Sequence, residues 1–163
     1  MLYIFDKDGT LIASLGKRPA NTPAEQRPLP NVIEKLAELR AAGHRLALAS
    51  NQGGVAWGFL TLEKVEALML DCAAKVGGLD AYRFSPYDSK AAARRPNSPY
   101  ARENELRKPR PGMLLEIMAE LGAAPQETVM VGDQESDREA AEAAGVQFEW
   151  AADFFGPAQN RTG

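Results

Sequence analysis

The sequence predicts an α/β fold with a mainly parallel five-stranded sheet, in a single domain over residues 1–163. Short apolar runs alternate along the chain with segments whose apolar residues recur at helical spacing. This alternation favours parallel strands joined by right-handed crossovers, with helices on both faces of the sheet. The length of 163 residues suits one domain with a sizeable core.

The predicted elements follow one another in a regular order. Leu2–Phe5 is expected to form the first strand, because four apolar residues are too few for a helix. Asn31 and Thr61 are candidate helix N-caps, and Pro111 suits the first position of a helix. The tail, residues 160–163, is expected to be frayed. The other strands are expected at 45–49, 81–84, 128–131 and 146–150, with helices at 32–42, 62–76 and 111–121 and a short one ending at 144.

The composition argues against several classes of protein. The net charge of −3 does not favour binding to a membrane or to nucleic acid by the protein as a whole. The one cysteine, Cys72, cannot form an intrachain disulfide and is expected to be a buried packing residue. The sequence shows no signal peptide and no apolar run of roughly 18 residues. We therefore expect a cytoplasmic protein, and a monomer.

Two long polar loops hold much of the positive charge. Segments 14–30 and 86–110 together contain ten Lys and Arg residues and four Asp and Glu residues, a net charge of +6, whereas the rest of the chain carries −9. If both loops flank the active site, the cleft between them would attract anions. The alternative is that they are ordinary solvated loops.

Polar residues follow several of the predicted strands, at the point where each strand ends. If the chain stays extended through Asp8, Asp6 and Asp8 point to the same side, and two carboxylates that close need a cation or a shared proton. Each residue alone is compatible with a turn, a cap or a solvated side chain, but their gathering at one sheet edge favours a ligand site. The residues expected at this edge are Asp6, Asp8, Ser50, Asn51, Lys108, Asp133 and Asp137.

Four segments that contain these residues resemble the four motifs of the haloacid dehalogenase (HAD) superfamily, in its phosphatase branch. They are Phe5–Leu11 (FDKDGTL), Ser50–Gly54 (SNQGG), Arg107–Met113 (RKPRPGM) and Val131–Asp137 (VGDQESD). The motifs occur in order and span most of the chain. The resemblance implies the three-layer, Rossmann-like fold of that superfamily.

The third motif resembles the small uncapped subgroup, subclass IIIA, so no large cap domain is expected. This subgroup contains heptose bisphosphate, histidinol and polynucleotide 3′-phosphatases, and Asn51–Gly58 is most similar to the D-glycero-D-manno-heptose-1,7-bisphosphate phosphatases. Trp57 stands where those enzymes usually have an arginine, which would remove one phosphate contact. Loop 86–110 has no Cys or His, so the zinc site of many such enzymes is not expected.

The resemblance implies a Mg²⁺-dependent phosphatase that acts through an aspartyl-phosphate. Asp6 is expected to be the nucleophile and Asp8 the general acid and base. Asp6, the backbone carbonyl of Asp8, and Asp133 are the expected Mg²⁺ ligands, supported by Asp137. The phosphate and substrate contacts are expected from Ser50, Lys108, Asn51, Arg107 and Thr10, the last also stabilising the turn after the aspartates.

Three functions follow, in decreasing order of preference. The first is hydrolysis of a small phosphorylated metabolite such as a sugar phosphate or bisphosphate. The second is a polynucleotide 3′-phosphatase; the uncapped site and basic loops favour nucleic-acid ends, but the sequence shows no aromatic-rich basic patch for base stacking. The third is a phosphoacceptor regulatory domain, which Asp8 argues against because it would activate water.

Overall fold

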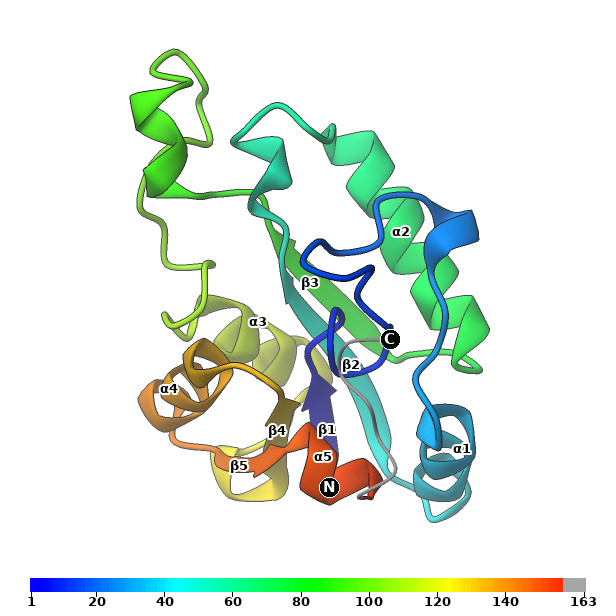
Figure 1. The fold of residues 1–163 in the computed structure, drawn as a ribbon. Helices are drawn as coiled ribbons and strands as arrows, with labels where there is room; N and C mark the ends of the chain where they lie inside the picture. The colour runs from blue at the N-terminus through cyan, green and yellow to red at the C-terminus, as the bar shows by residue number, and fades with distance from the viewer. Residues whose placement is uncertain (157–163) are drawn as a thin grey trace.

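The computed structural model describes residues 1–156 and contains one sheet of five parallel strands (Figure 1). The strands lie in the order β3-β2-β1-β4-β5, so β1 is central and, between β3 and β4, the chain crosses from the β3 edge to the other side of β1. The expected parallel sheet is therefore confirmed, while the predicted fraying of 160–163 lies outside the described residues. The strands are β1 Leu2–Phe5, β2 Arg45–Asn51, β3 Ala81–Ser85, β4 Thr128–Gly132 and β5 Gln147–Trp150.

The alternation of side chains in β1 supplies both layers of the core. Leu2 and Ile4 belong to one buried cluster, and Phe5 belongs to the other. All three are completely buried, which explains why a strand of four residues is sufficient at the centre of the sheet. The strand that leads to the predicted catalytic aspartates is therefore held from both faces.

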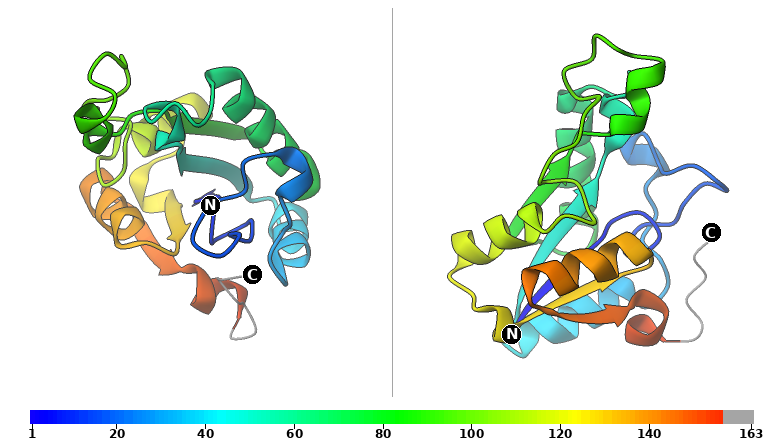
Figure 2. Two further views of the ribbon diagram at one scale, coloured as in Figure 1. Left: turned by 45° about the horizontal axis from the view of Figure 1, so that its top comes forward. Right: turned by 90° about the vertical axis from the view of Figure 1, so that its left-hand side faces the viewer.

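Helices cover the two faces unequally (Figure 2). Helices α1 (Val32–Ala41), α2 (Leu62–Lys75) and α5 (Ala151–Phe155) contribute to the cluster that contains Phe5. Helices α3 (Gly112–Leu121) and α4 (Glu135–Ala144) contribute to the opposite cluster. This is the expected three-layer arrangement. No helix among the described residues is long and apolar enough to cross a membrane.

Two helix starts differ from the sequence prediction. Asn31 precedes α1, but its backbone is left-handed (φ 70°) and its side chain caps no helical N–H. Its amide instead donates to the carbonyl of Phe155 at 3.1 Å, which ties α1 to α5, a helix that the sequence analysis did not predict. Pro111 lies one position before α3 rather than at its first residue. Thr61 caps α2 as expected, accepting from the N–H of Lys64.

The long loops stand at the carboxyl end of the sheet, with the turn that follows β2 (Figure 1). Loop 14–30 contains a short 3₁₀ helix, Pro23–Glu25, and loop 86–110 contains another, Ser89–Ala93. In the second loop, Tyr87 meets the ring of Tyr100 at 5.7 Å between centroids, and the Arg102 guanidinium lies over Tyr87 at 5.1 Å. Within residues 1–156 we find no separate cap domain over the sheet edge.

Candidate active site

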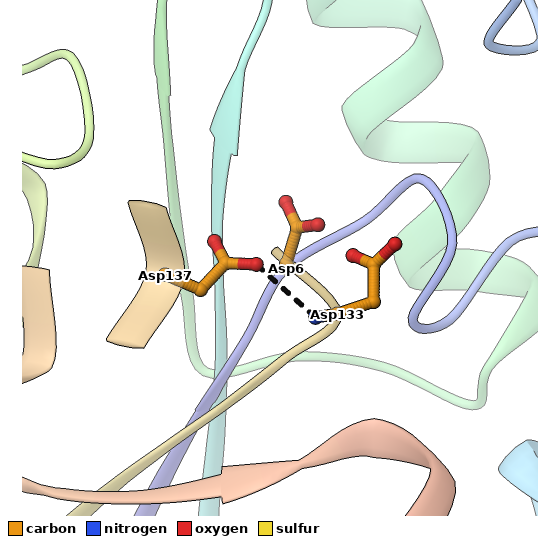
Figure 3. A group of neighbouring side chains, drawn as sticks. All are labelled: Asp6, Asp133 and Asp137. Atoms are coloured by element: carbon orange, nitrogen blue, oxygen red, sulfur yellow. Dashed lines mark hydrogen bonds between the residues drawn. The ribbon is translucent and has the colours of Figure 1, made fainter. Parts of the chain in front are cut away.

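Three carboxylates converge at the carboxyl ends of β1 and β4. Phe5 pairs with Val131 in the parallel ladder, and the N–H of Asp6 donates to the carbonyl of Val131 at 3.0 Å. Asp6, Asp133 and Asp137 each place a carboxylate oxygen within 4.8 Å of the others. Figure 3 shows Asp6 between the other two, with all three carboxylates turned to the same side. This arrangement is a candidate metal site in the described part of the chain.

Two glycines allow the carboxylates to approach so closely. A Cβ at Gly9 would lie 2.2 Å from Oδ2 of Asp133, and one at Gly132 would lie 2.4 Å from Oδ2 of Asp137. Gly9 also has a φ of +85°, a conformation that costs other residues energy. Both motif glycines therefore serve close packing around the acidic side chains.

Lys108 neutralises part of this negative charge from within the protein. Its Nζ donates to Oδ1 of Asp6 at 2.8 Å, to Oδ1 of Asp137 at 2.7 Å and to the carbonyl of Ala49 at 2.8 Å. Lys108 is 3% exposed, so all three protons are used in a buried setting. Burial alone would lower the pKa of Lys108, but the carboxylates of Asp137 and Asp6 outweigh it and raise the pKa. Lys108 is therefore a fixed cation at any physiological pH.

Burial raises the pKa of Asp6 to about 7, because Lys108 only partly offsets the loss of water and Asp133 adds repulsion. The pKa of Asp137 is also raised, by burial and then by Asp6, against the opposing effect of Lys108. One lysine is thus too little positive charge for three acids. A further cation fits the surplus, and a hard divalent ion with oxygen ligands fits it best.

The three acids differ in how free they are to bind that cation. Oδ1 of Asp137 accepts from Lys108, and its Oδ2 accepts from the backbone N–H groups of Asp133 and Gln134 at 3.2 and 3.0 Å. Asp137 is 1% exposed. All three acids line the cavity at the sheet edge, but the side chains of Asp6 and Asp133 accept fewer hydrogen bonds than that of Asp137. Asp137 is therefore better suited to hold Lys108 and the β4–α4 turn than to bind a metal directly.

Asp8 is held by two residues that the sequence analysis did not select. Its Oδ1 accepts from Nζ of Lys7 at 2.9 Å, and its Oδ2 accepts from the side-chain amide of Gln52 at 3.2 Å. Lys7 is completely buried and donates also to Oε1 of Gln26 at 2.6 Å. Lys7 lies between the two aspartates, at a bend after β1, and a lysine is rarely buried in this way. The sequence offers no signal that Gln26, nineteen residues away, is its partner.

The side chains of Ser50 and Asn51, at the end of β2, have different hydrogen-bond partners. Ser50 is 1% exposed, and its hydroxyl accepts from Gln52 at 2.8 Å, so Gln52 bridges Ser50 and Asp8. The side chain of Asn51 exchanges two hydrogen bonds with the backbone of Lys108, both at 3.0 Å. Asn51 therefore fixes the third motif against the second, a structural task in addition to its expected substrate contact.

Thr10 and Arg107, which were expected to bind substrate, both have hydrogen-bond partners within the protein. Thr10 has no exposed surface, and its hydroxyl donates to Oδ1 of Asp133 at 3.2 Å. This hydrogen bond ties the turn after the aspartates to the candidate metal site, and the expected substrate contact of Thr10 stays a prediction. The Arg107 guanidinium donates to the carbonyl of Tyr87 at 2.8 Å and lies 3.8 Å from the carboxylate of Asp88.

Both basic loops contribute to the cavities at the sheet edge. The predicted catalytic residues Asp6, Asp8 and Lys108 line a cavity of about 270 Å³ together with residues 17–19 of the first loop. A neighbouring cavity of about 460 Å³ shares residues 17–19 and Asn51, and extends to Arg107 of the second loop. A substrate bound at Asp6 therefore has room to extend between the loops.

Comparisons with known proteins agree with this site. The family model described as HAD-hydrolase-like matches residues 105–150, which contain the third and fourth motifs. The D-glycero-β-D-manno-heptose-1,7-bisphosphate 7-phosphatase of Haemophilus influenzae is 31% identical over 146 residues, covering 87% of this chain and 76% of that protein. The enzyme of the same name from Pseudomonas aeruginosa is 31% identical over 150 residues, covering 90% and 78%.

Solved structures give the same result. The D,D-heptose 1,7-bisphosphate phosphatase of B. bronchiseptica, complexed with magnesium and phosphate, is 27% identical with a TM-score of 0.70, covering 90% of this chain and 78% of that one. A structure described as a HAD-like phosphatase from Mesorhizobium loti has a TM-score of 0.76 at 24% identity, covering 89% and 68%, and supports the fold alone.

The fold and the cluster of Asp6, Lys108 and Asp133 define a hydrolase of the HAD type. The chain belongs to the HAD-like hydrolases, and its relatives over most of its length are heptose bisphosphate phosphatases. It is therefore a phosphatase of the HAD type.

Proposed function

We propose that the chain hydrolyses phosphate monoesters of small metabolites, such as a sugar phosphate or bisphosphate, through an aspartyl-phosphate at Asp6 and with the help of Mg²⁺. The observation that carries the proposal is the buried cluster of Asp6, Lys108 and Asp133 at the mouth of a cavity. A nucleophilic carboxylate, a fixed cation and a second acid are the groups that phosphoryl transfer to aspartate requires.

In the first step, a carboxylate oxygen of Asp6 attacks phosphorus and the P–O bond to the alcohol breaks. Oδ1 of Asp6 accepts a hydrogen bond from Lys108, so Oδ2 is the oxygen that we propose attacks phosphorus. Lys108 and the hydroxyl of Ser50 stabilise the charge on the transferring oxygens. Asp8, protonated, gives its proton to the departing alcohol.

In the second step, water attacks phosphorus and releases inorganic phosphate from Asp6. Asp8, now ionised, accepts the proton of this water. Lys7 and Gln52 hold one oxygen of Asp8 each and so limit its rotation. Loss of either donor would leave the acid and base poorly aimed.

A bound Mg²⁺ would supply Lewis-acid polarisation of the phosphate oxygens and neutralise the surplus acids. Asp6, Asp133 and the backbone carbonyl of Asp8 are the residues that would hold it. The fit of Mg²⁺ to these residues is supported by the raised pKa of Asp6, which burial and the nearby Asp133 produce although Lys108 opposes them.

The test measures phosphate release from a panel of sugar phosphates and bisphosphates. We expect Mg²⁺-dependent turnover that a chelator abolishes and that Asp6→Asn reduces to background while circular dichroism is unchanged. Turnover retained in Asp6→Asn would remove Asp6 as the nucleophile. No turnover of any monoester by the folded wild-type protein with Mg²⁺ would contradict the proposal as a whole.

A polynucleotide 3′-phosphatase is the second candidate. The observation that favours it is that two basic residues of loop 14–30, Lys17 and Arg18, line both cavities at the sheet edge. Comparing kcat/KM for a sugar bisphosphate and a 3′-phosphorylated oligonucleotide at physiological salt separates the two. A higher value for the oligonucleotide would replace the first candidate by the second.

A further inference from the structure

One wall of the neighbouring cavity is aromatic. Trp57 and Phe59, from the turn that follows β2, line it together with Leu60. The two rings are nearly parallel, with an interplanar angle of 8° and centroids 6.3 Å apart. Phe59 is 71% exposed, an unusual state for a phenylalanine that has no ring contact other than Trp57 among the described residues.

This wall adjoins the catalytic cavity directly. Both cavities include Asn51 and residues 17–19, so a leaving group attached to a phosphate at Asp6 can extend along the aromatic pair. The sequence analysis did not predict an aromatic patch beside the basic loops. The patch did not stand out because Lys17 and Trp57 are forty residues apart and meet only in the fold.

The charges around the aromatic pair are mostly compensated. The indole N–H of Trp57 donates to Oδ2 of Asp88 at 3.0 Å, and the same oxygen lies 3.8 Å from the Arg107 guanidinium. Arg107 also donates to a backbone carbonyl. Asp88 therefore restrains the indole of Trp57 and offsets the charge of Arg107. Because that charge is offset, this wall is a weak binding site for a second phosphate.

The cations on the opposite wall are also limited. The Arg18 guanidinium pairs with the carboxylate of Glu25 at 2.5 Å. Lys17 forms no ion pair with the other residues of 1–156, and it lines both cavities. The cleft thus offers one uncommitted cation beside the catalytic cavity and, beyond it, an exposed Phe59 ring next to a partly exposed Trp57 ring.

We propose that this aromatic wall is the leaving-group subsite and that it selects a phosphate monoester whose alcohol carries a planar heteroaromatic ring, as in a nucleoside monophosphate. The inference rests on the proposed function, since it names the substrate class of the same site. A nucleobase stacked on Phe59 and Trp57 gains ring contact without needing a second anion site. Because the ring lies away from the reacting bond, the gain appears mainly in KM.

The test compares ribose 5-phosphate with adenosine 5′-monophosphate, which share the reacting phosphate ester and differ by the base. We expect kcat/KM to be about tenfold higher for the nucleotide, mostly through a lower KM. Phe59→Leu and Trp57→Leu should each reduce this preference several-fold. Trp150→Leu is the matched control, because Trp150 is 38% exposed at the end of β5 and lines neither cavity; its preference should equal that of the wild type.

Two results would overturn the inference. One is equal or better turnover of ribose 5-phosphate, and the other is a nucleotide preference that neither aromatic substitution changes. Both leave the proposed function standing provided that hydrolysis depends on Asp6. Asp6-independent hydrolysis of both esters would contradict the proposed function instead, so the two failures are distinguishable.

Discussion

Two buried lysines serve the two aspartates that follow β1, in different ways. Lys108 donates to Asp6 and Asp137, two acids of the site, and to a backbone carbonyl. Lys7 donates to Asp8 and to the neutral amide of Gln26. Both are almost fully inaccessible to water. One lysine therefore compensates charge within the site, whereas the other joins the site to the loop beside it.

The contacts of Gln26 show where the second connection leads. Its amide donates to the carbonyl of Leu68 at 3.0 Å and to Oδ2 of Asp71 at 2.9 Å, both in α2. Lys75, also in α2, donates to the carbonyl of Gln26 at 2.9 Å. Lys7 thus links Asp8 to loop 14–30 and to α2, and we predict that this buried charge positions Asp8 without touching substrate.

Of the two lysines, Lys108 should have the larger effect on activity and stability when it is removed. Lys108→Met should lower kcat roughly a thousandfold, because the transferring oxygens lose their fixed cation. It should also destabilise the fold by roughly 3–5 kcal/mol, since it leaves Asp6 and Asp137 buried without their partner. Steady-state kinetics and urea unfolding measure both effects.

The control is Lys64→Met, which removes an exposed lysine of α2 and should change neither quantity. If Lys108→Met kept kcat within tenfold of the wild type, Lys108 would not be part of the phosphate chemistry. If it lost activity without any loss of stability, the ion pairs to Asp6 and Asp137 would carry less energy than their burial implies.

The effect of removing the other lysine should be smaller. Lys7→Met should lower kcat about tenfold to a hundredfold with little change in KM, because Asp8 keeps its hydrogen bond to Gln52 but loses one of its two donors. A kcat equal to that of the wild type would leave Lys7 with a purely structural role.

A double-substitution cycle sharpens this result. If Lys7 acts through Gln26, then Gln26→Leu should lower kcat several-fold alone and add little to Lys7→Met. Additive effects would mean that the two residues act separately and that the link from Asp8 to loop 14–30 carries no positioning role.

The smallest expected effect concerns pH and stability without Mg²⁺. The pKa of Asp6 is raised to about 7, so the folded protein keeps a proton that the unfolded chain releases near pH 4. This contribution to the free energy of unfolding is present below about pH 4 and is lost as the pH rises to about 7. Thermal unfolding from pH 4 to 8 should show the decline.

Two comparisons check the assignment of that slope. Asp6→Asn should flatten it but not abolish it, because the pKa of Asp137 is raised as well. Mg²⁺ added at pH 8 should raise the Tm of the wild type more than that of Asp6→Asn, since binding to the folded state alone stabilises it. Equal slopes in both proteins would show that Asp6 is not the group that keeps the proton.

The sequence was sufficient for the sheet and for the residues that follow its strands. Phe5, Asp6 and Asp133 could be placed because parallel strands end at one edge. Lys7 and Gln26 could not, since side-chain burial depends on a loop whose path no local pattern specifies. Asn31 was wrongly expected to cap α1, because α5, whose carbonyl it binds, was not foreseen. The sequence did not show that Trp57 and Phe59 line a cavity, because the other residues of that cavity, such as Lys17 and Arg107, lie far away in the sequence.

Trapping a phosphoenzyme tests the central claim most directly. Asp8→Asn is mixed with an aryl phosphate whose leaving group needs no protonation, quenched in acid and digested for mass spectrometry. The account predicts that one phosphoryl group accumulates on Asp6 in this variant, and that the wild type releases it too quickly for more than a trace to be found. A phosphoryl group on another residue, or turnover with no adduct in either protein, would contradict the account. A wild-type adduct that persists for minutes would favour a phosphoacceptor domain.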